Sequence, residues 1–154
     1  MSNSVLEDKR ILAVDDEPDV LAVLEEQVGD ICATCAFEKA TTYEEANRLL
    51  LSREYDAVVL DIMGVRGFDL LDIAVKRNFK VAMLTAHALS PEALNKSHDM
   101  GARAYIPKDK LGEIVPFLED LFKYDFKSGW ERLLDKLDSF FAHNFPKDWV
   151  RFGD

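Results

Sequence analysis

Two apolar stretches that run directly into aspartates decide how this chain folds. They are Ile11-Leu12-Ala13-Val14, followed by Asp15-Asp16, and Ala57-Val58-Val59-Leu60, followed by Asp61. Each stretch has the length and composition of a strand that is buried on both faces. Because ligands of an open parallel sheet bind at the carboxyl ends of its strands, we expect the three carboxylates to share a pocket. At about 5 Å and an effective dielectric constant of about 20, each pair of like charges would cost roughly 3 kcal/mol, which a bound cation would relieve.

Outward from these stretches, short apolar runs alternate with amphipathic stretches of helical length. This alternation is typical of a parallel sheet that is covered by helices. The expected strands are residues 11–14, 32–37, 57–60, 81–84 and 104–106. The expected helices are residues 18–28, 42–52, a stretch after Gly67, a stretch that begins at residues 90–92 and ends at Gly101, and residues 111–122. We therefore predict an α/β fold with a doubly wound, five-stranded parallel sheet and helices on both faces.

Local signals place several of the helix ends. Pro18 suits the first turn of a helix, and Gly29 suits its end. Thr42 and Glu45 form a capping-box pattern at the start of the second helix. These residues predict where the first two helices begin and that the first one ends at Gly29.

The sequence changes character after Lys123. Residues 124–154 hold eight of the sixteen aromatic residues, and five Lys or Arg against six Asp or Glu. A capping-box pattern at Ser128–Glu131 and an apolar stripe from Trp130 to Phe141 predict an extra C-terminal helix. We expect residues 1–123 to form one domain and residues 124–154 to form an aromatic-rich helical extension that is too short for a typical DNA-binding domain. This extension either packs on its own domain, binds a partner protein or makes a homodimer.

Composition narrows the class of protein. Apolar residues make up 48% of the chain and charged residues 31%, as in soluble globular proteins, and the net charge of −10 argues against direct nucleic-acid binding. No signal peptide or membrane-spanning run is evident, so we expect a cytoplasmic protein without membrane contact. Cys32 and Cys35 fall on an expected strand, where positions i and i+3 face opposite sides, so we expect two reduced thiols.

Four points of the sequence follow four of the expected strands: Asp15-Asp16, Asp61, Thr85 and Lys108. All four would have a role if the ligand were a phosphoryl group. Asp61 can act as the nucleophile, Mg²⁺ held by the carboxylates can neutralise phosphoryl oxygens, Lys108 can supply a further cation, and Thr85 can donate a hydrogen bond.

As a set, these residues resemble a known family, the response regulator receiver domain of two-component signalling. The resemblance covers about residues 9 to 123. It is carried by Val14-Asp15-Asp16-Glu17-Pro18, by Asp61, by Thr85-Ala86, and by the run from Gly101 to Lys108. It implies a flavodoxin-like sheet of strand order 2-1-3-4-5.

The resemblance also implies roles for individual residues. Asp61 would accept a phosphoryl group from a histidine kinase or a phosphotransfer protein, and Lys108 would contact that group and Asp61. Asp16 and Asp61 would bind Mg²⁺ directly together with the Met63 carbonyl, and Asp15 would act largely through water. Thr85 would move toward the phosphoryl group, and Tyr105 would swing inward, as a population shift between two states.

The sequence departs from the family pattern at two places. After Asp61, Met63 comes one residue early, proline is absent and Gly67 comes two residues early, so the loop is shortened. Lys108 is followed by Asp109 where the family has a proline after a cis bond. We expect this bond either to be trans, which would displace Lys108, or to be held cis by its surroundings. His87 lies where the family tunes its dephosphorylation rate.

Three functions remain in competition. The first is a phosphorylation-dependent switch that catalyses only its own phosphorylation and dephosphorylation. Its output partner, an unknown protein or a second copy, would bind the face made by the fourth helix, fifth strand and fifth helix, or residues 124–154. The second is a degenerate receiver that acts as a scaffold without phosphorylation. The third is an aspartate-nucleophile phosphatase, which Met63 argues against because such enzymes have a second aspartate at that position.

Overall fold

The structure, a computed structural model, describes residues 4–86 and 90–140 of the 154. In chain order its elements are β1 (Arg10–Val14), α1 (Pro18–Ile31), β2 (Ala36–Ala40), α2 (Tyr43–Ser52), β3 (Ala57–Asp61), α3 (Gly67–Lys76), β4 (Lys80–Thr85), α4 (Pro91–Asp99), β5 (Ala104–Pro107), the 3₁₀ helix η1 (Lys108–Glu113), α5 (Ile114–Lys123) and α6 (Phe126–Phe140).

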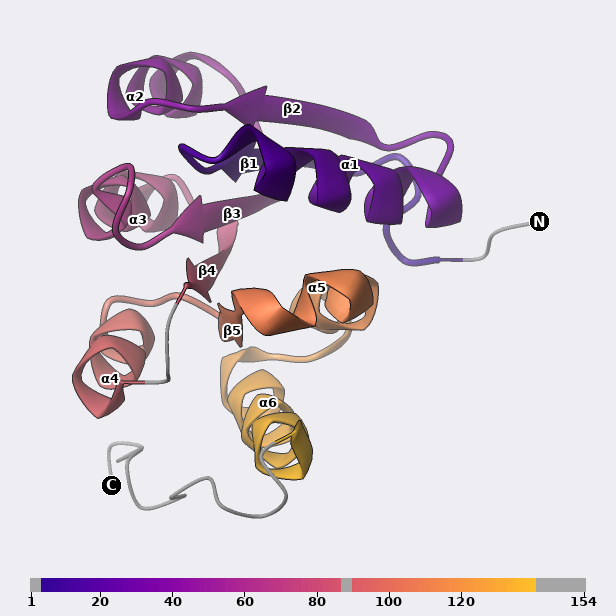
Figure 1. Cartoon of the computed structure of the whole chain (residues 1–154), viewed down its shortest axis with the longest axis vertical. Coiled ribbons are helices and arrows are strands. Elements are labelled where there is room, and N and C mark those ends of the chain that lie inside the picture. Colours follow the sequence, from indigo (N-terminus) through magenta and orange to yellow (C-terminus); the bar gives the residue numbers. More distant parts are fainter. Residues whose placement is uncertain (1–3, 87–89, 141–154) are drawn as a thin grey trace.

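The five strands form one parallel sheet in the order β2-β1-β3-β4-β5, which confirms the predicted fold class. Helices α1 and α5 cover one face of the sheet, and α2, α3 and α4 cover the other (Figure 1). Every residue of β3 is buried, as expected for a central strand with helices on both sides. The sheet reverses its winding between β1 and β3, the position at which such folds bind ligands.

Helix ends follow the local sequence signals in most cases. The Thr42 side chain accepts a hydrogen bond from Glu45 N at 3.2 Å, and Glu45 reaches back to Thr41 N, so α2 begins as predicted. Ser90 caps α4 in the same way through Ala93 N. Gly101 follows α4 with φ of 98°, a left-handed conformation that glycine adopts readily, which confirms its predicted role as a helix end.

The second strand was predicted four residues too early. Helix α1 continues through Gly29 to Ile31, and β2 begins at Ala36 instead of Cys32. Gly29 does not adopt the left-handed φ that ends a helix at glycine, so α1 continues past it. Because β2 is an edge strand, only Ala40 is fully buried, and the strand includes the charged residues Glu38 and Lys39. An edge strand of this kind is not marked by an apolar run.

The last predicted helix of the domain divides into two elements. Residues 108–113 form η1, and α5 starts at Ile114 instead of Leu111. Helix α6 starts at Phe126, before the predicted capping box, because Asp125 provides the cap: its side chain accepts a 2.7 Å hydrogen bond from Ser128 N. This bond from the backbone holds the pKa of Asp125 below its usual range.

Helix α6 packs on its own domain, against α5 and β5 (Figure 1). Its apolar face is buried and belongs to the single core, with Trp130 fully buried and its Nε1 donating to Ala102 O at 2.9 Å. On the other side of α6, Arg132 and Lys136 pair with Asp120 of α5. The alternative in which this helix packs in cis is therefore the one observed, while Phe141 and Trp149 lie outside the described residues.

Among the described residues, no helix is long and apolar enough to cross a membrane.

Trp130→Ala should lower the free energy of unfolding by about 3–5 kcal/mol, because it removes a large buried side chain and leaves Ala102 O without its donor. Urea denaturation followed by circular dichroism measures the loss. The exposed neighbour provides the control: Glu131→Ala should change stability by less than about 0.5 kcal/mol. A loss below about 1 kcal/mol for Trp130→Ala would mean that α6 is not part of the core.

Candidate functional site

The structure brings the three aspartates together at the carboxyl ends of β1 and β3. Residues 11–14 of β1 pair in register with residues 57–60 of β3, so Asp15 and Asp61 leave the sheet side by side. Ligand oxygens of Asp15, Asp16 and Asp61 all lie within 4.8 Å of one another. Asp15 and Asp61 are buried, whereas Asp16 is exposed. The acidic cluster is thus buried at Asp15 and Asp61 and exposed to solvent at Asp16.

Backbone groups fix two of these carboxylates. Asp15 Oδ1 accepts a 2.9 Å hydrogen bond from Glu17 N, and Asp61 Oδ2 accepts a 3.0 Å hydrogen bond from Gly64 N. The shortened loop after Asp61 therefore folds back on its own carboxylate. A Cβ atom at Gly64 would overlap the Asp16 carboxylate, and one at Gly67 would overlap the Asp61 carbonyl. Both glycines are needed for this close approach.

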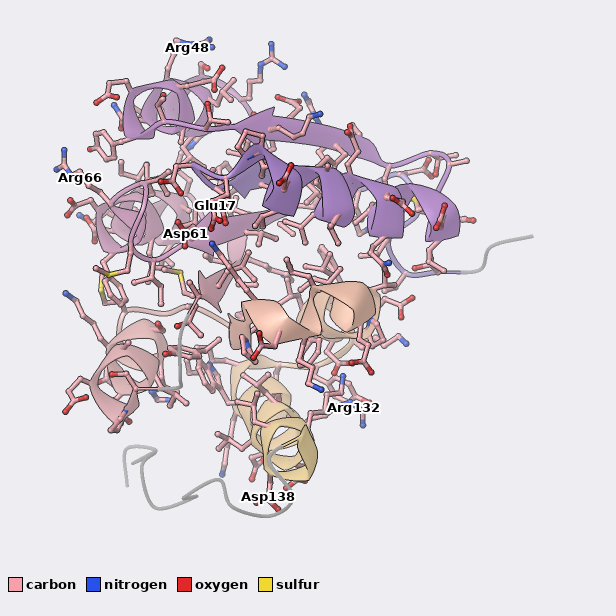
Figure 2. All side chains as sticks on the ribbon, viewed as in Figure 1. Glu17, Arg48, Asp61, Arg66, Arg132 and Asp138 are labelled. Carbon is pink, nitrogen blue, oxygen red and sulfur yellow. A yellow bond between two sulfur atoms is a disulfide. The ribbon has the colours of Figure 1, made fainter. Side chains whose placement is uncertain are left out.

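Lys108 connects three carboxylates. Its Nζ lies 2.8 Å from Asp15 Oδ2, 3.0 Å from Glu17 Oε1 and 3.2 Å from Asp61 Oδ1. No peptide bond in the described part of the chain is cis, so the Lys108–Asp109 bond is trans. Of the two alternatives for this bond, the trans form is the one observed, and the long lysine side chain still reaches Asp61. Figure 2 shows Glu17 and Asp61 close together on this side of the sheet.

Glu17 is the member of the site that the sequence reasoning missed. Glu17 belongs to the motif that follows the first expected strand, but the sequence analysis predicts no role for its side chain. Its position two residues after Asp15, in the turn that leads into α1, places its carboxylate within reach of Lys108. The only sequence signal was a third acidic residue beside the aspartate pair.

The site contains more carboxylate groups than ammonium groups and therefore carries a net negative charge. Burial raises the pKa of Asp15 above its usual value and the Asp61 charge adds to this, while Lys108 and Glu17 N act in the opposite direction. Burial would lower the pKa of Lys108, but Asp15, Glu17 and Asp61 together raise it above its usual range. Three aspartates thus face one ammonium group.

The donor set fits a hard divalent cation. Mg²⁺ prefers oxygen ligands and binds to proteins through a few carboxylates with water completing its shell. Asp15 Oδ2 is buried and is held 2.8 Å from the Lys108 ammonium group. Asp16 leaves one side accessible. Asp15, Asp16 and Asp61 are therefore the residues that could hold the ion, while the Met63 side chain is 79% exposed.

The two remaining expected site residues lie on β4 and β5. Thr85 is the last residue of β4, is half-buried and pairs with Pro107, the residue before Lys108. Tyr105 is fully buried in β5, and its hydroxyl accepts a 3.3 Å hydrogen bond from Ser90 N at the start of α4. Tyr105 is thus already in an inward position. His87 lies outside the described residues.

The arrangement of strand-end acids, threonine, buried tyrosine and lysine agrees with a comparison of the sequence with known families. Residues 11–118 match the response regulator receiver domain. The chain belongs to this family. Receiver domains act in two-component signalling, and residues 11–118 form such a domain in this chain.

A curated response regulator is similar to this chain over most of the chain's length. It is 31% identical over 137 residues to the two-component response regulator ARR18 of Arabidopsis thaliana, a match that covers 84% of this chain. The match covers only 21% of that protein, so the chain spans about a fifth of the length of this curated relative.

Solved structures support the fold. The receiver resembles the response regulator DrrB of Thermotoga maritima, an OmpR/PhoB homolog, with a TM-score of 0.65 at 22% identity, over 77% of this chain and 57% of that one. It resembles a CheY-like receiver domain protein of Methanospirillum hungatei with a TM-score of 0.58 at 24% identity, over 88% of this chain and 98% of that one.

Asp15→Asn should stabilise the metal-free receiver at neutral pH. Because the pKa of Asp15 is raised, the folded state binds its proton more tightly than the unfolded chain, and stability falls as pH rises from the ordinary aspartate pKa through the raised one. Asp15→Asn should not show this part of the loss of stability with rising pH. Urea denaturation in the presence of a chelator, from about pH 4 to about pH 8, measures it.

Asp72→Asn is the matched control, because Asp72 is an exposed carboxylate on α3 that pairs with Lys76. It should leave the pH profile unchanged. If Asp15→Asn instead destabilised the protein at neutral pH, the ion pair with Lys108 would outweigh the cost of burying the charge.

Gly64→Ala should weaken divalent-cation binding by roughly tenfold or more, because the new methyl group would push the Asp16 carboxylate away from its partners. Calorimetric titration with Mg²⁺ or Mn²⁺ measures the change. Gly112→Ala is the control, since nothing lies within 4 Å of a Cβ at that position. Equal affinities for the two variants would show that Asp16 is not a ligand.

Proposed function

We propose that this receiver is a phosphorylation-dependent switch that accepts a phosphoryl group on Asp61 from a histidine kinase or a phosphotransfer protein. The single observation that carries the proposal is the environment of Asp61. Its carboxylate is buried at the end of a central strand, 3.2 Å from the Lys108 ammonium and within a cluster of three acids. A carboxylate held in this way has a cation on one side and a solvent-open pocket on the other.

The transfer exchanges one bond for another. An oxygen of the Asp61 carboxylate forms the new P–O bond as the P–N bond of the donor phosphohistidine breaks, and the electron pair of that bond returns to the imidazole. Mg²⁺, held by Asp15, Asp16 and Asp61 with the Met63 carbonyl as a further ligand, would neutralise charge on the phosphoryl oxygens. Gly64 N, 3.0 Å from Asp61 Oδ2, fixes the orientation of the carboxylate.

Lys108 would respond to the change of charge that the transfer produces. In the unmodified receiver its ammonium is shared among Asp15, Glu17 and Asp61. Once Asp61 carries a phosphoryl group, that group offers Lys108 more negative charge in the same place. The proposal assigns Lys108 to stabilising the phosphoryl group.

Thr85 and Tyr105 would pass the change to the surface. Thr85 would donate its hydroxyl to the phosphoryl group, and Tyr105 lies on the neighbouring strand, where it pairs with Met83, two residues before Thr85. Because Tyr105 is already buried and bonded to Ser90 N, the switch would act on the population of this inward state and on the position of α4.

The output would be a protein contact. Helix α6 already occupies part of the face formed by α4, β5 and α5, where Trp130 meets the His98 ring of α4 with 5.2 Å between ring centroids. A partner or a second copy that binds this face would therefore contact α6 or displace it.

We propose residues 1–123 as the receiver domain and residues 124–154 as an extension for protein contact and not for DNA binding. We also propose that the protein is cytoplasmic, where it would meet the proposed donor. It would catalyse only its own phosphorylation and dephosphorylation and would not turn over external substrates.

Incubation with acetyl phosphate and Mg²⁺ tests the proposal. We expect an adduct of one phosphoryl group that is stable in acid and labile in base, and expect it to fall to background in Asp61→Asn. Intact-mass measurement and phosphate-affinity gels follow it. Asp72→Asn should be labelled like the unmodified sequence, because that carboxylate is exposed on α3 and pairs with Lys76, not with Lys108. Labelling of Asp61→Asn would place the acceptor elsewhere, and no labelling by acetyl phosphate or a cognate kinase would favour the scaffold alternative.

A further inference from the structure

Cys32 and Cys35 lie together at the end of the sheet opposite to the acidic pocket. Cys32 directly follows α1 and Cys35 directly precedes β2, and the two form a disulfide with Cα atoms 5.6 Å apart. The prediction of two separate thiols was wrong because it placed both residues on a strand. In the structure they lie in the turn between a helix and a strand, where positions i and i+3 can meet.

The surroundings of the pair suit the reduced form as well as the oxidised one. Leu6 O lies 2.7 Å from Cys35 Sγ and 3.4 Å from Cys32 Sγ, so it can accept hydrogen bonds from the thiols of the reduced pair. It also accepts from Lys9 N at 3.0 Å, so it stays satisfied when the sulfurs are joined. Neither redox state leaves the buried Leu6 carbonyl without a partner.

The two sulfurs differ in accessibility. Cys32 is only 3% exposed, whereas Cys35 is half-buried, and the intervening Ala33 and Thr34 are exposed. A solvent-open cavity of about 360 Å³ lies beside the pair and is lined by Glu25, Val28, Gly29, Ala33 and Phe37. A small thiol or disulfide can therefore approach Cys35 first.

A structural staple is not the best account of this bond. The sequence separation of the two cysteines is 3, so the disulfide closes only a short covalent loop. The entropy that a disulfide removes from the unfolded chain grows with loop length, and this one removes little. The domain has a large core, to which Cys32 contributes one buried side chain among many.

From this geometry we infer that Cys32 and Cys35 form a thiol–disulfide exchange site for low-molecular-weight disulfides of the glutathione class. The Cys35 thiolate attacks one sulfur of the small disulfide, and a mixed disulfide forms as the first small thiolate leaves. The Cys32 thiolate then attacks Cys35 Sγ and expels the second. Two electrons pass from the protein to the small disulfide, and the two protons of the thiols end on the released thiolates.

The oxidation state would act on the N-terminal segment. Thr34, between the cysteines, accepts a 3.0 Å hydrogen bond from Asp8 N, and Leu6 is fully buried beneath the pair. Farther along, Ser4 Oγ donates to Glu119 of α5 at 2.7 Å. The site therefore connects the turn after α1 to the segment before β1 and, through it, to α5. This inference goes beyond the proposed phosphorylation and does not depend on it.

Equilibration of the full chain in glutathione buffers of graded reduced-to-oxidised ratio, followed by alkylation and intact-mass analysis, tests the inference. We expect an intramolecular disulfide whose fraction follows the ratio and returns to zero on adding excess dithiothreitol. Cys32→Ser should stop at a mixed disulfide on Cys35. Cys35→Ser should react with glutathione disulfide about tenfold more slowly than Cys32→Ser, because Cys32 is buried.

Two results would overturn it. A pair that stays reduced at every ratio would be two ordinary thiols, and a pair that reduced glutathione in excess leaves oxidised would be a permanent crosslink. Because the readout is thiol mass alone, Asp61→Asn should behave like the unmodified sequence. Failure of phosphorylation and failure of redox exchange are thereby distinguishable.

Discussion

The structure depends on how one ammonium group balances several carboxylates at the edge of the sheet. Oxygens of Asp15, Asp16 and Asp61 lie within 4.8 Å of one another. At about this spacing each pair of charges repels by roughly 3 kcal/mol at an effective dielectric constant of about 20. Lys108 offsets part of this repulsion by contacting Asp15 and Asp61 at once. Gly64 N holds the Asp61 carboxylate, and η1 begins at Lys108 itself.

The parallel register of the sheet is what imposes this crowding. The pairing of residues 11–14 with 57–60 aligns the ends of β1 and β3, so their following residues emerge at the same point. The pairing of Thr85 with Pro107 brings β4 and the start of η1 to the same edge. Backbone hydrogen bonds thus assemble a site from residues that are far apart in the sequence. The three aspartate carboxylates repel one another, and the backbone pairing of the strands holds them close despite this repulsion.

Much of the fold could be read from the sequence because β1, β3 and β4 are continuous apolar runs, and β1 and β3 are followed by or end in acids. The same rule failed for β2, an edge strand that carries Glu38 and Lys39 and has only one fully buried residue. The misplaced strand led to the wrong interpretation of Cys32 and Cys35. The three acids were predicted to converge, but the contact of Glu17 with Lys108 was not, because a side chain in a turn can point in several directions.

Helix α6 also has a consequence for the behaviour of the protein in a crowded solution. The outer edge of a sheet exposes unpaired backbone groups, which can recruit strands from other molecules. At one edge, α6 packs along β5, and Trp130 takes up the Ala102 carbonyl (Figure 1). At the other edge, β2 carries Glu38 and Lys39, charged residues that discourage further strand pairing. The two edges of the sheet therefore carry different features that discourage pairing with a strand of another molecule.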